Sequence, residues 1–265
     1  MYSTTYHRPT SLADATALMK SGEAKYIAGG QTLIPAMRLR LAAPSDLIDL
    51  AHIAELKGIE VSGRAVTIRA GTTHGEVATS RELKAVCPAI CDLAAVVGDP
   101  QVRHKGTIGG SIANNDPAAD YPAAVLALDA TVVTNKREIS AGDFFSGLFE
   151  TALEEDEIVT AVRFEAPERA GYEKFRNPAS RFALTGVFVA KGANGVRVAV
   201  TGAGDDGVFR STEIEAALAK NFEPSALQGV TVPSGNLMTD LHASADYRAN
   251  LIVVMARRAV MKANG

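Results

Sequence analysis

The chain has 265 residues, of which 47% are hydrophobic and 22% charged, and its formal net charge is -3. This composition is typical of a globular protein with a hydrophobic core and excludes a collagen-like or largely disordered chain. The small negative charge, without a basic stripe, gives no electrostatic basis for binding nucleic acid, so we expect no such partner. We expect no membrane span, because no run of about 18 apolar residues occurs. We expect a cytoplasmic location, because the chain does not open with a signal-peptide pattern.

Two cysteines, Cys87 and Cys91, lie four positions apart in the sequence CPAIC. Pro88 stands between them and no second Cys or His cluster accompanies them, which argues against a metal site. We therefore predict two buried thiols. Since two cysteines alone cannot ligate an iron–sulfur cluster, any redox chemistry in this chain requires an organic cofactor.

The first part of the chain is predicted to form a helix and three strands. Ser11 is the expected N-cap of a helix over residues 11–19, and Gly22 is the expected stop signal. Strands are predicted at 26–28, 47–50 and 65–70 from their apolar or alternating patterns. A second helix is predicted to begin at Thr72 or Thr73.

The middle of the chain is predicted to be mainly helical. An apolar helical region at 82–97 is interrupted near Pro88, and the run Gly98-Asp99-Pro100 ends it, so 101–110 is predicted to be an exposed or ligand-facing loop. Asp120 and Pro122 are predicted to open another helix. The remaining predicted elements are a strand at 131–134, a loop with one helical turn at 140–157 and a strand at 157–167.

A change of pattern follows a predicted polar hinge at 167–171. The last part contains strands within 172–191 and at 196–204, a helix at 211–220 and a Pro- and Gly-containing linker. The closing helix, 246–262, is predicted to bury Leu251, Val254 and Met255 and to expose Arg248, Arg257 and Lys262. Strands followed by helices in each half favour two α+β lobes over a single α/β sheet.

Two glycine-rich segments lie far apart in the sequence, AGGQT at 28–32 and GTIGGSIANNDPAADYP at 106–122. Glycine lets backbone N–H groups approach a phosphate closely, so two such segments could hold a diphosphate from both sides. A tight turn with a capping hydroxyl also explains either segment taken alone. Neither segment is GxGxxG followed by an acidic residue, nor GxxxxGKS/T, which disfavours a Rossmann site and a P-loop.

The two segments and their surroundings resemble a known family. IAGGQTLIPAMRLR, DPQVRHKGTIGGSIANNDPAADYPAAVLALDATV and YEKFRNPASRFALTGV are similar, in this order, to the FAD-binding medium subunit of the molybdenum hydroxylases, which include aerobic carbon monoxide dehydrogenase and xanthine dehydrogenase. HASADYRANLIVVMARRAV resembles the C-terminal helix of that family. The resemblance extends over nearly the whole chain, from about Tyr6 to Ala263.

The resemblance implies an α+β fold in two parts. The first is a two-lobed FAD-binding domain of the PCMH type, similar to vanillyl-alcohol oxidase, at 1–168, with lobes at about 1–55 and 56–168. The second is a small α+β domain at 169–265 with a short antiparallel sheet and helices.

The resemblance also implies the cofactor site. Backbone N–H groups of Gly29 to Thr32 would face the pyrophosphate, hydroxyls of Thr107 and Ser111 would add hydrogen bonds, and Asn114 and Asp120 would hold the sugar or the loop. Val97, Ile158 and Lys174 match positions near the adenine or the isoalloxazine. The expected cofactor-binding residues are Ile27, Ala28, Gly29, Gly30, Gln31, Thr32, Leu33, Ile34, Val97, Thr107, Ile108, Gly109, Gly110, Ser111, Asn114, Asp120, Ile158 and Lys174.

The function implied is that of an oxidoreductase subunit in which FAD accepts electrons from iron–sulfur clusters of a partner and passes them to quinone, NAD or oxygen. The expected partners are a large subunit with the molybdenum cofactor and a small subunit with two 2Fe–2S clusters, arranged as a dimer of heterotrimers. No residue of this chain is expected to act on the organic substrate. A stand-alone FAD-dependent oxidoreductase of the same fold and an assembly subunit without FAD are the alternatives.

Three residues depart from the family pattern, and several others invite a functional interpretation. Many relatives have His-Ser where this chain has Gln31-Thr32, and Asn115 stands where a small residue or histidine is common.

His74 and His104 are predicted to lie on solvated loops, and the acidic run 150–157 on a solvated face. Asp120 is predicted to be a helix cap or ribose ligand rather than an acid paired with Asp116. Ser111 lacks the GxSxG context of a nucleophile, and Arg176 and Arg181 are predicted to face water.

Overall fold

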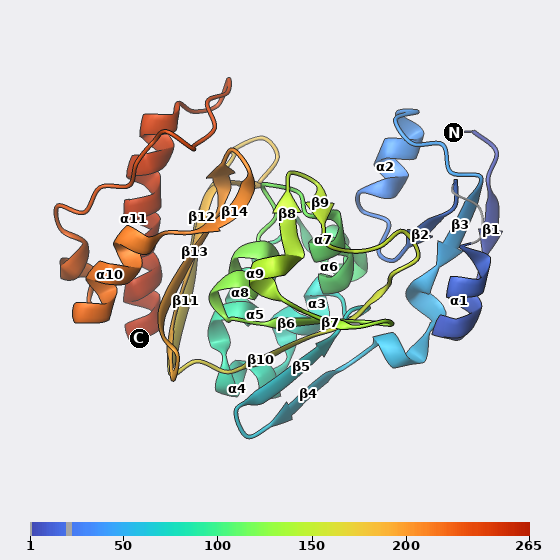
Figure 1. The fold of residues 1–265 in the computed structure, drawn as a ribbon, viewed down its shortest axis with the longest axis horizontal. Coiled ribbons are helices and arrows are strands. Elements are labelled where there is room, and N and C mark those ends of the chain that lie inside the picture. The colour runs from blue at the N-terminus through green and yellow to red at the C-terminus, as the bar shows by residue number, and fades with distance from the viewer. Residues whose placement is uncertain (1, 20–22) are drawn as a thin grey trace.

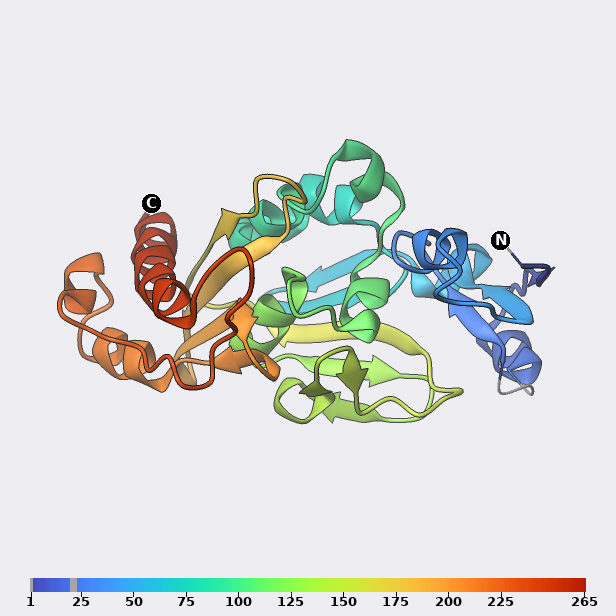
Figure 2. The same ribbon diagram turned by 90° about the horizontal axis from the view of Figure 1, so that it is seen from above.

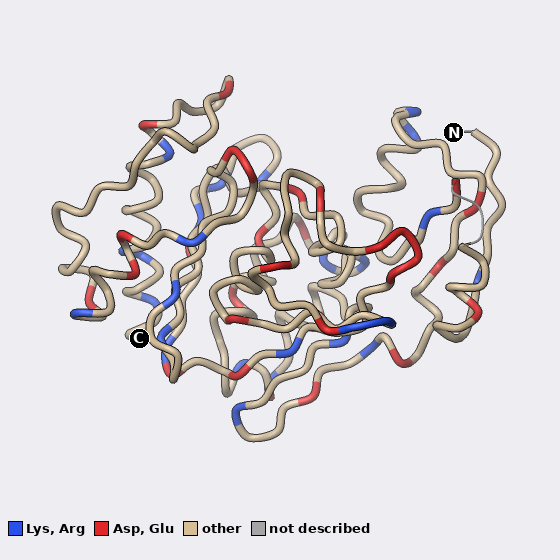
Figure 3. The backbone as a smooth tube through the Cα atoms, in the orientation of Figure 1, with Lys and Arg blue, Asp and Glu red and all other residues tan. Residues whose placement is uncertain are grey.

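The computed structural model of the chain describes residues 2–19 and 23–265. Three main sheets follow one another along the long axis, with the N-terminus at one end and the C-terminal helix at the other (Figures 1 and 2). Basic and acidic residues are interspersed over all three parts (Figure 3). The mixture of helices with largely antiparallel sheets confirms the α+β class. None of the described helices has the length and apolar character needed to cross a membrane.

The first sheet has three short parallel strands in the order β1, β3, β2. Its part of the chain contains β1 (Thr5–His7), α1 (Leu12–Leu18), β2 (Lys25–Ile27), α2 (Leu33–Arg38), β3 (Asp46–Asp49) and the 3-10 turns η1 (Leu50–His52) and η2 (Ala54–Leu56). Helix α1 begins as predicted, because the Ser11 side chain accepts the N–H of Asp14. The predicted stop at Gly22 lies outside the described residues. Helix α2 is not among the predicted elements.

The second sheet has five antiparallel strands in the order β4, β5, β10, β6, β7. Its strands are β4 (Ile59–Ser62), β5 (Ala65–Arg69), β6 (Thr131–Thr134), β7 (Glu138–Ser140) and β10 (Val159–Glu165), with a hairpin of β8 (Phe145–Gly147) and β9 (Glu150–Thr151). The helices are α3 (His74–Thr79), α4 (Arg81–Val86), α5 (Pro88–Ala95), α6 (Pro100–Lys105), α7 (Ile108–Asn114), α8 (Tyr121–Ala127) and α9 (Ala141–Phe144). Pro88 separates α4 from α5 as predicted, and both cysteines are free and buried, also as predicted.

The third sheet is an antiparallel meander packed on both faces. It consists of β11 (Arg169–Arg176), β12 (Ala183–Gly192), β13 (Gly195–Gly204) and β14 (Gly207–Arg210), followed by α10 (Thr212–Lys220), η3 (Pro224–Leu227) and α11 (Ala245–Asn264). In β12, Val187 and Val189 pack in the core that contains α11, whereas Phe188 and Ala190 pack in the core that contains α5 and α8. Because both faces are covered, β12 is apolar at consecutive positions.

The main sheets change at two points of the chain. The first part ends with η2 at Leu56 and β4 begins at Ile59, while β10 ends at Glu165 and β11 begins at Arg169. These junctions lie close to the predicted boundaries at residues 55 and 168. The division of the chain into domains stays a prediction.

Two segments predicted to be irregular are largely regular. The loop predicted at 101–110 is mostly helical, because helix α6 covers 101–105 and α7 covers 108–110, with only 106–107 between them. The reason is local, because the Asp99 carboxylate accepts the N–H groups of Gln101 and Val102 and so caps a new helix that opens with Pro100. The predicted hinge at 167–171 is short, because β11 begins at Arg169 and pairs with β12 along its whole length.

Arg248 on α11 is buried, which contradicts the prediction that it is exposed. Its side chain is 2% exposed, and its guanidinium donates to the backbone carbonyls of Leu184 and Gly202 and, at 2.7 Å, to Asp240. Hydrogen bonds to strands and to a carboxylate from elsewhere in the chain offset the cost of burial. The helix pattern cannot reveal such partners. Arg257 is half-buried, and Lys262 is exposed as predicted.

Candidate functional site

A cavity of about 1260 Å³ lies where the three main sheets meet. Its wall contains residues 25–33 from the first part of the chain, residues 104–107 and 109–111 from the second, and Lys174 with 179–182 from the third. The cavity therefore depends on the packing of all three parts. Both predicted glycine segments contribute to it.

The first glycine segment connects β2 to α2. Gly30 has a φ of +70°, a conformation that favours glycine. Among the described residues, no backbone or side-chain acceptor receives the N–H groups of Gly29, Gly30, Gln31 or Thr32. The Gln31 side-chain amide donates to the Gly29 carbonyl at 3.0 Å and so stays within the loop. This segment therefore offers a row of backbone donors to a bound group.

The second glycine segment uses most of its backbone donors within the protein. The N–H of Ile108 donates to Thr72, that of Gly109 to Ala70 at 2.9 Å, and that of Gly110 to the Thr107 hydroxyl at 3.1 Å. The Thr107 hydroxyl caps α7 by accepting this bond and can still donate its own hydrogen. The donors that this segment can offer are therefore mainly the hydroxyls of Thr107 and Ser111.

The two segments touch each other through glycine. A Cβ on Gly29 would lie 2.2 Å from the Lys105 carbonyl oxygen and 2.6 Å from the Gly106 Cα. A Cβ on Gly110 would meet only the Thr107 hydroxyl oxygen, at 3.0 Å, and the Ala28 Cβ, at 3.8 Å. Gly29 is thus required for the contact between the segments, and Gly110 keeps the space between them open.

His74 is buried, contrary to the prediction of a solvated loop. It is the first residue of α3, its N–H donates to the Gly106 carbonyl at 2.9 Å, and its side chain lies beside Tyr121 with ring centroids 5.2 Å apart. Burial, assisted by the nearby Arg103, lowers the pKa of His74 to about 4, so the ring is neutral at physiological pH. His104 is exposed but lies on α6 rather than on a loop.

Asp120 and Lys174 form a buried ion pair at the cavity wall. The Lys174 ammonium donates to the Asp120 carboxylate at 2.9 Å, and their side chains are 2% and 4% exposed. The Tyr172 hydroxyl donates to the same carboxylate. Burial raises the pKa of Asp120, while Lys174 and Tyr172 act in the opposite direction. Asp120 is the N-cap residue of α8 by position, but its side chain makes no capping hydrogen bond, so of the two predicted roles, cap or ribose ligand, the side-chain cap is wrong. Lys174 does not face water.

The third sheet holds the segment between α7 and α8 in place. The Thr201 hydroxyl lies 2.6 Å from the Ala119 carbonyl oxygen, and the N–H of Gly202 donates to the Pro117 carbonyl at 2.8 Å. Asp116 accepts the N–H of Ala118 in a local turn, at 2.9 Å. The position of Asp120 in the cavity therefore depends on β13, which lies far away in the sequence.

Most of the predicted cofactor-binding residues line the cavity. The exceptions are Ile34, whose Cδ1 packs against Gly30, and Ile108, which is fully buried in the largest core. Asn115 does not line it either, because its side-chain amide donates to the carbonyls of Gly147 and Glu150, both at 2.8 Å, and anchors the β8–β9 hairpin.

Sequence reasoning missed several cavity residues. Leu56, Gly71 and Leu153 line the cavity although no motif marks them. Glu157 also lines it, and the prediction that the acidic run forms a solvated face is wrong for this residue, because it is 4% exposed and paired with Arg137. Arg181 and Phe182 are exposed at the rim. Among these missed residues, only Gly71 has a recognisable position in the sequence, because it lies between the predicted strand at 65–70 and the predicted start of a helix at Thr72 or Thr73.

A large cavity bordered by free backbone donors, hydroxyls and a buried cation is suited to a dinucleotide with a pyrophosphate and flat rings. Residues 2–167 match the family model described as the FAD binding domain in molybdopterin dehydrogenase. The chain belongs to this family and is an FAD-binding medium subunit of the molybdenum hydroxylase type, an oxidoreductase component.

Relatives extend the similarity over the whole chain. The chain is 34% identical over 272 residues to the carbon monoxide dehydrogenase medium chain of Hydrogenophaga pseudoflava, covering 96% of this chain and 95% of that one. It is 33% identical to the nicotine 6-hydroxylase medium subunit of Paenarthrobacter nicotinovorans, covering 97% and 96%.

Solved structures share the fold. A carbon monoxide dehydrogenase from Hydrogenophaga pseudoflava matches with a TM-score of 0.84 and 33% identity over 99% of this chain and 97% of that one. Quinoline 2-oxidoreductase from Pseudomonas putida 86 matches with a TM-score of 0.87 and 26% identity, again over 99% and 97%.

Proposed function

We propose that the FAD pyrophosphate lies between the two glycine segments. The observation that carries the proposal is the row of backbone N–H groups at Gly29–Thr32 that donate to no atom among the described residues, while the glycines keep the facing segment close. Preorganised donors of this kind suit a dianionic group. The hydroxyls of Thr107 and Ser111 complete the donor set.

The rings of FAD would lie along the apolar and cationic walls. Val97 and Ile158 supply apolar surface, and Asn114 and Asp120 lie where they could contact a sugar hydroxyl. Asp120 balances the charge of Lys174, but the ammonium group has further N–H donors that can reach a neighbouring ring. FAD supplies the electron-transfer chemistry, and these residues bind and orient it.

The function that this site supports is electron relay within a larger complex. We propose that electrons reach the flavin from iron–sulfur clusters of a small subunit, which receives them from a large molybdenum-cofactor subunit, and leave to quinone, NAD or oxygen. The similarity to medium subunits over the whole chain supports partners of this kind. The dimer of heterotrimers and the cytoplasmic location stay predictions.

Absorption spectroscopy of the purified full chain, with FAD added and with co-expressed partners, tests the proposal. We expect a bound flavin spectrum, which Gly110→Leu abolishes by filling the space between the segments, whereas Gly142→Leu on α9, where the nearest atom to an added Cβ is 3.8 Å away, retains it. An intact flavin spectrum in Gly110→Leu would show that the flavin binds elsewhere. A substrate that reduces the flavin of the isolated chain would favour a stand-alone oxidoreductase.

A further inference from the structure

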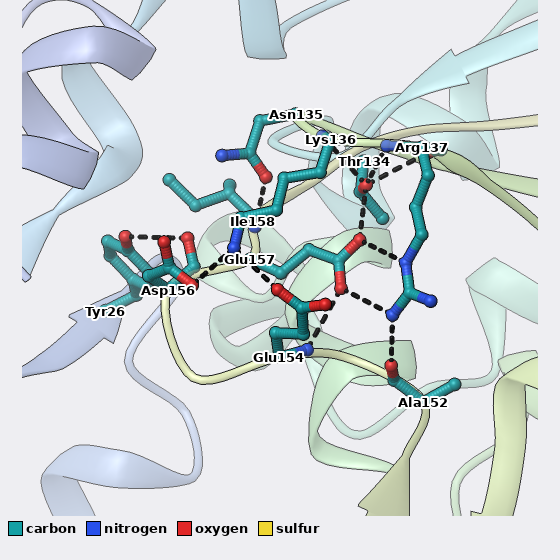
Figure 4. A network of polar contacts seen from close by, with 10 residues as sticks. All are labelled: Tyr26, Thr134, Asn135, Lys136, Arg137, Ala152, Glu154, Asp156, Glu157 and Ile158. Carbon is teal, nitrogen blue, oxygen red and sulfur yellow. Dashed lines mark hydrogen bonds and ion pairs between the residues drawn. The ribbon is translucent and has the colours of Figure 1, made fainter.

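A short segment between β9 and β10 lies beside the cavity and contacts the first part of the chain. Residues 152–158, which we call the strap, lie between β9 and β10, and Figure 4 shows several of their side chains. Three of its residues, Leu153, Glu157 and Ile158, line the cavity, and so does Val159, the first residue of β10. The strap passes the turn between β6 and β7, which carries Arg137.

Arg137 and Glu157 form a bidentate ion pair at the centre of this network (Figure 4). The Arg137 Nε donates to Glu157 Oε1 at 3.0 Å, and Nη2 donates to Oε2 at 2.9 Å. The Glu157 side chain is 0% exposed, whereas that of Arg137 is 46% exposed. Two parallel hydrogen bonds fix the orientation of both groups, unlike a single contact.

Further hydrogen bonds saturate the Glu157 carboxylate. The Thr134 hydroxyl lies 2.7 Å from Oε1, and the N–H of Glu154 donates to Oε2 at 3.0 Å. Arg137 Nη2 also donates to the Ala152 carbonyl at 2.7 Å. The pair therefore ties the β6–β7 turn to both ends of the strap.

The next residue, Ile158, is held by two bonds from the same turn. Its N–H donates to the Asn135 side-chain carbonyl at 2.8 Å, and its own carbonyl accepts the Asn135 N–H at 3.0 Å. The Ile158 side chain is 3% exposed and packs with Ile48, Ile53 and Leu56 of the first part. Ile158 thus directly precedes β10 of the second sheet but packs in the core of the first part.

A second contact joins the strap to the first part. The Tyr26 hydroxyl donates to the Asp156 carbonyl at 3.3 Å, and Tyr26 lies in β2, which leads directly into the first glycine segment. Burial raises the pKa of Tyr26 to about 12, so the hydroxyl keeps its proton. Lys136 pairs with Glu154 and Asp156 on the outside, where such exposed contacts contribute little.

We propose that Arg137 and Glu157 are positioning residues for the flavin site, which hold the strap so that Ile158 and the first glycine segment face the second glycine segment at the spacing that FAD requires. This inference rests on the proposed location of FAD. Neither residue is part of a glycine segment, and no sequence motif marks the pair. Their effect on FAD passes through Ile158 and Tyr26.

The pair stays charged over the whole physiological range. Arg137, together with hydrogen bonds from Glu154 and Thr134, lowers the pKa of Glu157 from 4.5 to about 2. A carboxyl group whose pKa is lower in the folded than in the unfolded protein stabilises the folded state at pH values above its unfolded-state pKa. This stabilisation is lost as the pH falls through the folded-state pKa. The stabilisation by Glu157 is therefore complete above about pH 5 and lost toward pH 2, so the pair acts as a constant support rather than as a pH switch.

The test compares FAD binding by the full chain and its variants Arg137→Gln, Arg137→Lys and Glu157→Gln, with Arg163→Gln as the matched control. Arg163 lies on β10 of the same sheet and pairs with Glu138 in solvent, away from the cavity. Kd is measured by quenching of flavin fluorescence at a temperature where each apo variant is folded, together with visible circular dichroism of the bound flavin. Melting of the apo chain is recorded separately.

We expect the Kd for FAD to rise about tenfold or more in Arg137→Gln and Glu157→Gln, with a changed visible circular dichroism spectrum, and to stay unchanged in Arg163→Gln. Arg137→Lys, which keeps the positive charge but cannot make two parallel hydrogen bonds to the carboxylate, should give an intermediate Kd. A purely structural role would lower the melting temperature and leave Kd and the spectrum unchanged, and that result would overturn the proposal. If Glu157→Gln does not fold, the two Arg137 variants decide, because this side chain is half exposed.

The glycine variants separate failure of this inference from failure of the proposed site. If Gly110→Leu binds FAD normally, the flavin lies elsewhere and both proposals fail. If Gly110→Leu loses FAD while Arg137→Gln and Glu157→Gln bind it like the unmodified chain, the site is supported and only the positioning role is refuted.

Discussion

The contact between the two glycine segments can be tested by adding one methyl group. In Gly29→Ala, the new Cβ would lie 2.2 Å from the Lys105 carbonyl oxygen and 2.6 Å from the Gly106 Cα. Both neighbours are backbone atoms, so neither can move away by rotating a side chain. The segments must separate by about 1 Å to restore ordinary van der Waals distances.

The magnitude follows from the cost of overpacking. Forcing an additional carbon into a close-packed contact costs about 1–3 kcal/mol. If the segments relax apart in the free chain and must be brought together again to hold FAD, this cost appears in binding, and Kd rises about 5- to 150-fold. Gly110→Ala, whose Cβ meets a hydroxyl oxygen at 3.0 Å, should have a smaller effect.

Titration of the apo chain with FAD, followed by flavin fluorescence, measures this difference. Gly142→Ala serves as the control, because an added Cβ there has no neighbour closer than 3.8 Å. Thermal melting establishes that each variant is folded at the temperature of the titration. An unchanged Kd in Gly29→Ala would refute the reasoning that contact between the segments sets the width of the pyrophosphate site.

Three further outcomes are expected. Lys174→Met leaves the buried Asp120 without its cation and should destabilise the chain by about 3–5 kcal/mol in chemical denaturation. Without Lys174, burial raises the pKa of Asp120 further, so the stability of this variant should fall as the pH rises above 3.8, the ordinary pKa of an Asp carboxyl. Burial raises the pKa of Cys87 to about 12 and of Cys91 to about 11, so iodoacetamide at pH 8 should label neither in the folded chain and both in denaturant. Arg248→Met leaves two carbonyls of β12 and β13 without their donor and should lower the free energy of unfolding by roughly 2 kcal/mol or more, whereas the half-exposed Arg257→Met should cost less.

Features encoded within a few neighbouring residues could be predicted from the sequence. The N-cap at Ser11, the break at Pro88 and the start of α3 after Thr73 depend on side-chain hydrogen bonds or ring geometry that act over three or four positions. The loop predicted at 101–110 was wrong for a similarly local reason, because Asp99-Pro100 can end one helix and begin the next.

Errors about individual side chains have a different origin. Arg248, Glu157 and His74 were predicted to face solvent, and all three are buried. Two of the three partners of Arg248 are strand carbonyls more than 40 residues away, and Glu157 pairs with Arg137 across 20 residues. A charged residue looks the same in the sequence whether or not a distant partner offsets its desolvation.

The sequence by itself indicated the family through its resemblance to the medium subunits, and the α+β class through its order of strands and helices. It also located the two glycine segments, because glycine, proline and capping residues restrict the backbone wherever they stand. Only the tertiary structure decided that Gly29 packs on Gly106, that the backbone donors of the second segment are already used, and that Lys174 neutralises Asp120 rather than facing water. These features arise from contacts between residues far apart in the chain, and the free energy of burying a polar group depends on which partner the fold brings to it.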